Sequence, residues 1–131
     1  RQDHLARHRL ADLFLDTFYL NAHSTASDAL WAGLPVVTRI GEQFVARVAA
    51  SLLTAIGLPE LIVKTDQEYE ALALELATNQ SILESIAKKL EKNRRSEPLF
   101  KTETYTQNLD QAFEQAYTHY YKGYPPKDII A

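Results

Sequence analysis

The stretch NAHSTASDALWAGLPVVT, residues 21–38, decides the fold that we expect for this chain. A polar turn at 21–25 leads into a short helical segment at 26–32, which Gly33-Leu34-Pro35 ends. An apolar strand follows at 36–38, and another strand-like run precedes the turn at 12–16. Strand, turn, helix and strand in this order predict a βαβ unit, and therefore an α/β fold built on a parallel sheet.

The polar turn before the helix is a candidate anion site. His23, Ser24 and Thr25 follow the first predicted strand at its carboxyl end, where open α/β sheets bind ligands. The first N–H groups of a helix are unpaired and its dipole is positive there, so a phosphate-bearing ligand is our first hypothesis. A structural alternative fits the residues equally well: Ser24 or Thr25 caps the helix, with Asp28 placed as a capping-box partner.

Hydrophobic periodicity predicts the remaining elements. We expect the end of a helix at 3–9, a third strand at 61–63, and helices at 44–56, from Asp66, at 81–94 and from Thr104. Asp66 is the expected cap of its helix, and Asn79 the break that ends it. The basic side chains of 3–9 and of 88–95 are expected to be solvated.

Two predictions concern the core. Trp31, which lies in an apolar helical segment, is expected to be a core anchor. In the helix at 44–56 the apolar positions fall at helical spacing, the pattern of a helix with one apolar face; they are Phe44, Val45, Val48, Leu52 and Ile56.

Composition excludes several classes of function. The chain has 131 residues and a formal net charge of -3, which argues against nucleic acid or an anionic membrane as a partner. It contains no cysteine, which excludes disulfides, thiolate chemistry and cysteine-based zinc sites. No apolar run approaches membrane-spanning length and no signal-peptide pattern opens the sequence, so we expect a cytoplasmic protein.

A family resemblance sharpens these expectations. Residues 23–38 closely resemble the donor-binding segment of the O-GlcNAc transferase family, which includes the SPINDLY-like relatives, in the pattern His23-Ser24-Thr25-x-x-Asp28-x-Leu30-Trp31-Ala32-Gly33-x-Pro35-Val36-Val37-Thr38. Further similar segments follow in the family's order at 10–12, 15–17, 41–42, 47–51, 60–64, 67–70, 98–100 and 105–106. The resemblance therefore covers nearly the whole chain.

The resemblance implies a GT-B architecture, in which two Rossmann-like lobes face each other across a cleft. Residues 1–122 would be the C-terminal half of the nucleotide-sugar-binding lobe with its closing helix, and 123–131 a tail. The implied reaction is inverting and metal-independent, without a cofactor: N-acetylglucosamine passes from UDP-GlcNAc to a Ser or Thr hydroxyl of a protein. The parent chain would supply the other lobe and tetratricopeptide repeats, so the segment alone is expected to be inactive, and its exposed sheet edge to favour self-association.

The resemblance also assigns six donor-binding residues. His4 and Arg7 match residues on the uracil side, which replaces the solvated reading of these two side chains. His23, Ser24 and Thr25 match the diphosphate-binding group, and Asp28 matches the ribose-binding carboxylate. No catalytic residue and no metal ligand is assigned within the chain.

Three alternatives stay open at this stage. SPINDLY-like relatives in plants transfer fucose from GDP-fucose, so the sugar and the base are not fixed. Another GT-B enzyme, such as a small-molecule glycosyltransferase or a UDP-sugar epimerase, shares the same sheet and donor loop. A non-catalytic module that binds a nucleotide would also retain these residues.

Overall fold

The computed structural model describes residues 2–129, so residues 130 and 131 of the predicted tail lie outside the described residues. The chain forms two compact units, Arg1–Leu99 and Phe100–Ala131. The first unit contains the sheet and the predicted donor-binding residues. The predicted functional division, 1–122 with a tail at 123–131, stays a prediction.

The first unit is built on three parallel strands: β1 (Phe14–Leu15), β2 (Val36–Arg39) and β3 (Ile62–Val63). They lie in the order β1-β2-β3, with Phe14 opposite Val36 and Thr38 opposite Ile62. The central strand is the buried one, since Val36, Val37 and Thr38 are all inaccessible to solvent. The predicted α/β fold with a parallel sheet is therefore confirmed, with outer strands shorter than expected.

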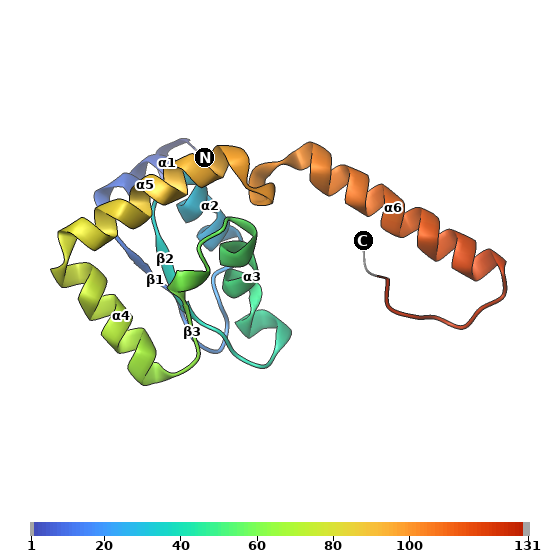
Figure 1. Ribbon diagram of the computed structural model, residues 1–131, viewed down its shortest axis with the longest axis horizontal. Helices are drawn as coiled ribbons and strands as arrows, with labels where there is room; N and C mark the ends of the chain where they lie inside the picture. Colours follow the sequence, from blue (N-terminus) through green and yellow to red (C-terminus); the bar gives the residue numbers. More distant parts are fainter. Residues whose placement is uncertain (1, 130–131) are drawn as a thin grey trace. The chain divides into compact units, whose positions relative to one another are not determined.

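Helices cover both faces of this sheet (Figure 1). The crossover helices α2 (Ser24–Ala32) and α3 (Val48–Ala55) contact each other and β2, while α4 (Asp66–Thr78) contacts β2 from the other side. Right-handed crossovers that advance across a sheet in one direction place their helices on the same face of it, and this accounts for the contact between α2 and α3. The helix α5 (Gln80–Ser96) contacts α2 and α4, and α1 (Gln2–Arg7) contacts α2.

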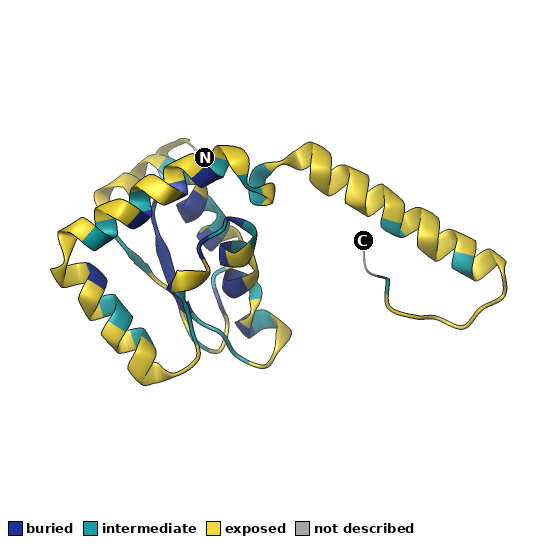
Figure 2. Ribbon diagram, viewed as in Figure 1, coloured by how far each residue is buried: buried dark blue, intermediate teal, exposed yellow. Residues whose placement is uncertain are grey.

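Short 3-10 turns connect these elements, at η1 (His8–Leu10), η2 (Phe44–Ala46), η3 (Pro59–Leu61) and η4 (Pro98–Phe100). The core lies between the sheet and its helices (Figure 2). Leucine supplies most of its largest fully buried side chains, together with Ile56; the leucines are Leu30, Leu53, Leu58, Leu61, Leu76 and Leu90.

The apolar residues that fall at helical spacing in 44–56 are, except for Ile56, not the residues that the segment buries. The segment is a 3-10 turn followed by α3, and its buried residues are Ala46, Ala49, Ala50, Leu53 and Ile56. Phe44 is 71% exposed, and Val45, Val48 and Leu52 are only half-buried. The alanines let α3 approach the sheet closely, which turns the bulkier neighbouring stripe outward.

Trp31 is not a core anchor, because half of its surface is exposed. The inner face of α2 is formed by Ala26, Ala29 and Leu30. A helix turns by about 100° per residue, so the position after Leu30 points away from the sheet. The carbonyl of Trp31 instead accepts a hydrogen bond from the Arg94 guanidinium, which fixes the end of α2 to α5.

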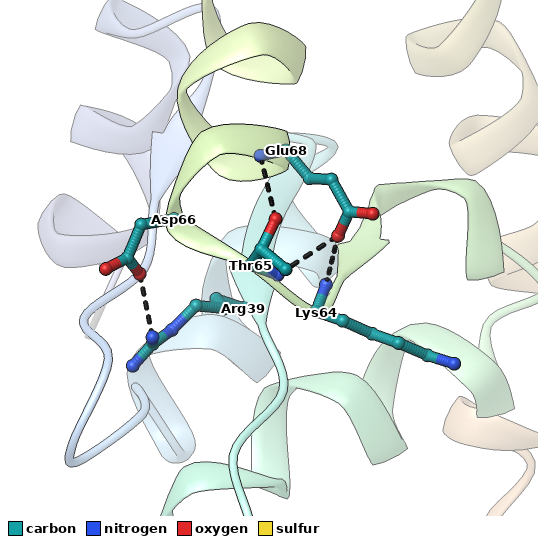
Figure 3. Close-up of polar contacts among 5 residues, drawn as sticks. All are labelled: Arg39, Lys64, Thr65, Asp66 and Glu68. Carbon is teal, nitrogen blue, oxygen red and sulfur yellow. Dashed lines mark hydrogen bonds and ion pairs between the residues drawn. The ribbon is translucent and has the colours of Figure 1, made fainter.

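The cap of α4 is Thr65 and not Asp66 (Figure 3). Thr65 Oγ1 accepts the Glu68 N–H at 3.1 Å, and Glu68 Oε2 accepts the N–H groups of Lys64 and Thr65 at 2.8 and 3.0 Å. This is a reciprocal capping box. Asp66 pairs instead with the Arg39 guanidinium at 2.7 Å, which fixes the start of α4 to the end of β2.

Replacing Thr65 by Ala should destabilise the protein by about 1 kcal/mol, because the Glu68 N–H loses its acceptor. The N–H of Lys64, and then that of Thr65, lowers the pKa of the Glu68 carboxyl below its ordinary value of 4.5. Its contribution to stability is therefore present above that value and is lost as the pH falls through the lower, folded-state pKa.

Urea unfolding at neutral pH and at about pH 3 measures both effects. The variant Glu68→Gln should lack this part of the acid dependence. Thr78→Ala is a matched control, since its hydroxyl bonds only to the Leu74 carbonyl within α4. Equal stability of the Thr65 variant and the wild type would contradict the capping role.

The second unit carries the long helix α6 (Thr102–Tyr121), as predicted. Its apolar side chains recur every four residues at Tyr105, Leu109, Phe113 and Tyr117, and all four are exposed. After α6 the chain is irregular up to residue 129. Within residues 2–129, no helix combines the length and the apolar character needed to cross a membrane.

Candidate functional site

The start of α2 presents polar groups at the carboxyl end of the sheet. His23 is the N-cap residue and makes no side-chain cap, while Ser24 and Thr25 are the first two helical residues. All three side chains are exposed, and the hydroxyls of Ser24 and Thr25 have no hydrogen-bond partner among the residues that the structure describes. The capping alternative is therefore wrong. The first N–H groups of a helix have no partner within it, and here two exposed hydroxyls lie beside them, an arrangement suited to an anion.

A second polar cluster joins α1 to α2 and contains His4, Arg7 and Asp28. The Arg7 guanidinium lies 2.8 Å from His4 Nδ1, and His4 Nε2 lies 3.4 Å from Asp28 Oδ2. A guanidinium only donates, so His4 Nδ1 accepts and its proton is on Nε2, directed toward the carboxylate. The structure thus brings together three predicted site residues that are up to 24 positions apart in the sequence.

His8 contacts the His4 residue of this cluster, although it was expected to be a solvated cation. It is buried, and its Nδ1–H donates to the His4 carbonyl at 3.0 Å. Its ring also meets the His4 ring edge-on, with centroids 5.0 Å apart. His8 begins η1, which contacts α2, and the spacing of basic residues does not show which one of them turns inward.

Asp28 links the two groups of predicted residues. It lies one helical turn after Ser24 and Thr25, so its side chain projects from the same face of α2. No hydrogen bond or ion pair among the described residues joins His23, Ser24 or Thr25 directly to His4 or Arg7. The His23 ring instead lies edge-on to the ring of Phe44, with centroids 6.3 Å apart. The site is therefore one continuous surface along α2, bordered by α1 and η2.

Sequence reasoning missed Asp16 and Thr38, which lie beneath this surface. Asp16 Oδ1 accepts the Ala22 N–H at 2.7 Å, and Asp16 Oδ2 accepts the Thr38 hydroxyl at 2.7 Å. Both side chains are buried. The signal in the sequence was the carboxylate of Asp16, at the end of a predicted apolar strand. A carboxylate is rarely buried unless it is paired, so its place beside the core indicated a hydrogen-bonded role.

A surface cavity of about 830 Å³ lies elsewhere. Its lining includes Leu13 and Pro35, which precede β1 and β2, so it opens at the amino ends of the strands. Ligands of open α/β sheets bind at the opposite, carboxyl edge. We therefore place the candidate site at the polar start of α2 and not in this cavity.

The sequence and the structure are both similar to those of known glycosyltransferases. The family model described as Glycosyl transferase family 41 matches residues 1–109. The UDP-N-acetylglucosamine--peptide N-acetylglucosaminyltransferase of Caenorhabditis elegans is 38% identical over 95% of this chain. A probable enzyme of the same name from Arabidopsis thaliana, SEC, is 38% identical over 97%, and the barley SPINDLY protein is 36% identical over 95%.

A solved structure agrees with these matches. A mutant of the Thermobaculum terrenum O-GlcNAc transferase superposes with a TM-score of 0.83 at 34% identity, over 88% of this chain and 22% of the other. The chain spans only 11% of the Caenorhabditis elegans relative and 13% of each of the two plant relatives. The similarity thus covers nearly all of this chain but a small part of each relative.

Proposed function

The chain belongs to glycosyl transferase family 41, and we propose that it forms the donor-binding part of a protein O-glycosyltransferase. The proposed reaction transfers N-acetylglucosamine from UDP-GlcNAc to a Ser or Thr hydroxyl of a polypeptide. The observation that carries this proposal is the uncapped start of α2, where two exposed hydroxyls and unpaired N–H groups lie one turn from the His4–Asp28 pair.

Each group has a role that its chemistry permits. The hydroxyls of Ser24 and Thr25 and the N–H groups of α2 would donate to the diphosphate, with His23 beside them. The carboxylate of Asp28 would accept hydrogen bonds from the ribose hydroxyls, and the adjacent His4 would orient it. His4 and Arg7 together would border the uracil, where the planar guanidinium offers a stacking surface.

The same groups would assist the transfer step. The acceptor hydroxyl gives up its proton to a base, and its oxygen forms a bond to the anomeric carbon from the face opposite the UDP oxygen, whose bond to that carbon breaks, so the configuration inverts. UDP leaves with the bonding electron pair and added negative charge. Donors already oriented at the helix start would stabilise that charge without reorganisation, which is the role that a metal ion plays in other enzymes.

Several parts of the proposal concern the rest of the protein. We propose that the other lobe of the same parent chain completes the cleft, that the parent is cytoplasmic and carries tetratricopeptide repeats, and that transfer needs no metal. The edge position of β1 supports self-association of the isolated chain, because an unpaired strand edge recruits another strand. Light scattering at several concentrations checks this last point, and a dilute, stable monomer would contradict it.

A transfer assay with the intact protein tests the proposed activity. We expect label from UDP-GlcNAc to appear on Ser or Thr of an acceptor polypeptide, in the presence of a chelator as well as without it. Transfer only to sugars or lipids would identify a small-molecule enzyme. A folded protein that binds UDP and transfers nothing to any acceptor would be a non-catalytic nucleotide-binding module.

A further inference from the structure

We propose that Asp16 is the positioning residue that holds the phosphate-binding turn of the donor site in place. The proposal rests on the function proposed above and adds a residue that touches no ligand. Asp16 directly follows β1, and its carboxylate lies between β2 and the turn that leads into α2. It is 4% exposed, so its role is internal to the protein.

Both oxygens of this carboxylate are used. Oδ1 accepts the N–H of Ala22, the residue before His23, and Oδ2 accepts the hydroxyl of Thr38 on β2, each at 2.7 Å. Thr38 is completely buried, so its hydroxyl depends on this acceptor. The carboxylate therefore fixes the turn to the central, buried strand of the sheet.

The backbone of Asp16 is held as well. Its N–H donates to the Val37 carbonyl at 3.0 Å, and its carbonyl accepts the Tyr69 hydroxyl of α4 at 2.9 Å. Burial of the Tyr69 hydroxyl raises its pKa above the ordinary value of 10.0, and the negative charge of the Asp16 carboxylate is a second, smaller cause. The hydroxyl therefore keeps the proton that it donates. The backbone of Asp16 is thus held by β2 within the sheet and by α4 on one face of the sheet.

Further contacts leave the turn few alternative conformations. The Asn21 N–H donates to the Val45 carbonyl at 2.9 Å, and its side-chain amide donates to the Thr17 carbonyl at 2.8 Å. Between these anchors and α2, the Ala22 N–H is held by the Asp16 carboxylate, its one hydrogen-bond partner within residues 2–129. Loss of that contact would free the start of α2, where His23, Ser24 and Thr25 present their donors.

Substitutions of Asp16 separate positioning from general stability. Asp16→Ala removes both acceptors, and we expect UDP to bind to the intact protein roughly tenfold more weakly. Asp16→Asn retains the contact with the turn, since its amide oxygen still accepts the Ala22 N–H, while its amide nitrogen faces the Thr38 oxygen and takes away only the acceptor of the Thr38 hydroxyl. We therefore expect Asp16→Asn to bind UDP within about twofold of the wild type.

The matched control is Leu53→Ala, a core variant on α3 that loses stability but none of these contacts. Affinities are compared at a temperature at which circular dichroism shows every variant folded. Without ligand, hydrogen exchange of a peptide covering 21–26 should be faster in Asp16→Ala than in the wild type and unchanged in Asp16→Asn. The acceleration in Asp16→Ala should be larger than any acceleration in Leu53→Ala.

The outcomes are distinct. The proposal is supported if Asp16→Ala binds UDP more weakly than the wild type, while Asp16→Asn and Leu53→Ala bind UDP with nearly the wild-type affinity. An unchanged affinity of Asp16→Ala, or equal acceleration of exchange in Leu53→Ala, overturns it. A wild-type protein that binds no nucleotide would refute the proposed function, and the exchange data would still decide whether Asp16 holds the turn.

Discussion

Replacing Asp28 by Asn should weaken the binding of UDP to the intact protein roughly 10- to 100-fold. A hydrogen bond to a charged acceptor contributes about 1.5–3 kcal/mol, and 1.4 kcal/mol corresponds to a factor of ten. The amide replaces one carboxylate oxygen by a donor and removes the negative charge that ribose hydroxyls would meet. It also disturbs the contact with His4 Nε2, now 3.4 Å from Asp28 Oδ2. Isothermal titration with UDP measures the loss.

The matched control for this prediction is Glu70→Gln. Glu70 is exposed on α4, across the sheet from α2, and its replacement makes the same change from carboxylate to amide. We expect it to bind UDP like the wild type, because removal of a distant exposed charge is screened by solvent and salt. If Asp28→Asn and Glu70→Gln bound UDP equally well, the ribose role of Asp28 would be refuted.

Replacing Leu53 by Ala should lower the free energy of unfolding by about 2–5 kcal/mol. Leu53 is fully buried on the inner face of α3, so truncation removes its packing and leaves a cavity. The neighbouring Leu52 supplies a matched control with the same chemical change. Because Leu52 is only half-buried and borders an open apolar groove, Leu52→Ala should cost far less.

Hydrogen exchange at the amides of β2 measures both costs in the intact protein, since we expect the amides of this central, buried strand to exchange when the first unit unfolds. The pair of variants also tests which face of α3 points inward. Equal destabilisation by the two variants, or a larger effect of Leu52→Ala, would favour the face predicted from spacing and contradict the structure.

The fold class was predictable because its signals are local. A polar turn between apolar runs at 12–16 and 36–38 specifies a crossover, and Asn79 separates two helices by capping the second through its side chain. The inner face of α3 was not predictable from spacing, because a stripe of alanines and a stripe of larger apolar residues share the same helix. Which stripe faces the sheet is decided by the distance of closest approach, a tertiary property.

The cap of α4 shows a signal that was present and missed. Thr65 is followed three residues later by Glu68, which is the spacing of a capping box, but the adjacent Asp66 is also a common cap residue. Only the structure shows that Asp66 pairs with Arg39, which leaves the cap to Thr65.

The candidate site was predictable in part. The polar start of α2 follows from its position after a strand, whereas His4 and Arg7 resemble a solvated helix end when judged from their residues alone. Their approach to Asp28 joins segments far apart in the sequence, which periodicity does not reveal. The resemblance to the family supplied that link, and the contacts between α1 and α2 are consistent with it.

The most direct test of the donor site is a titration of the intact protein with UDP and, in parallel, with GDP. The account predicts that UDP binds more tightly than GDP, and that Asp28→Ala and Thr25→Ala both bind UDP more weakly while remaining folded. A preference for GDP would point to a fucose donor instead. A folded protein that binds neither nucleotide, or variants that bind UDP as the wild type does, would contradict the account.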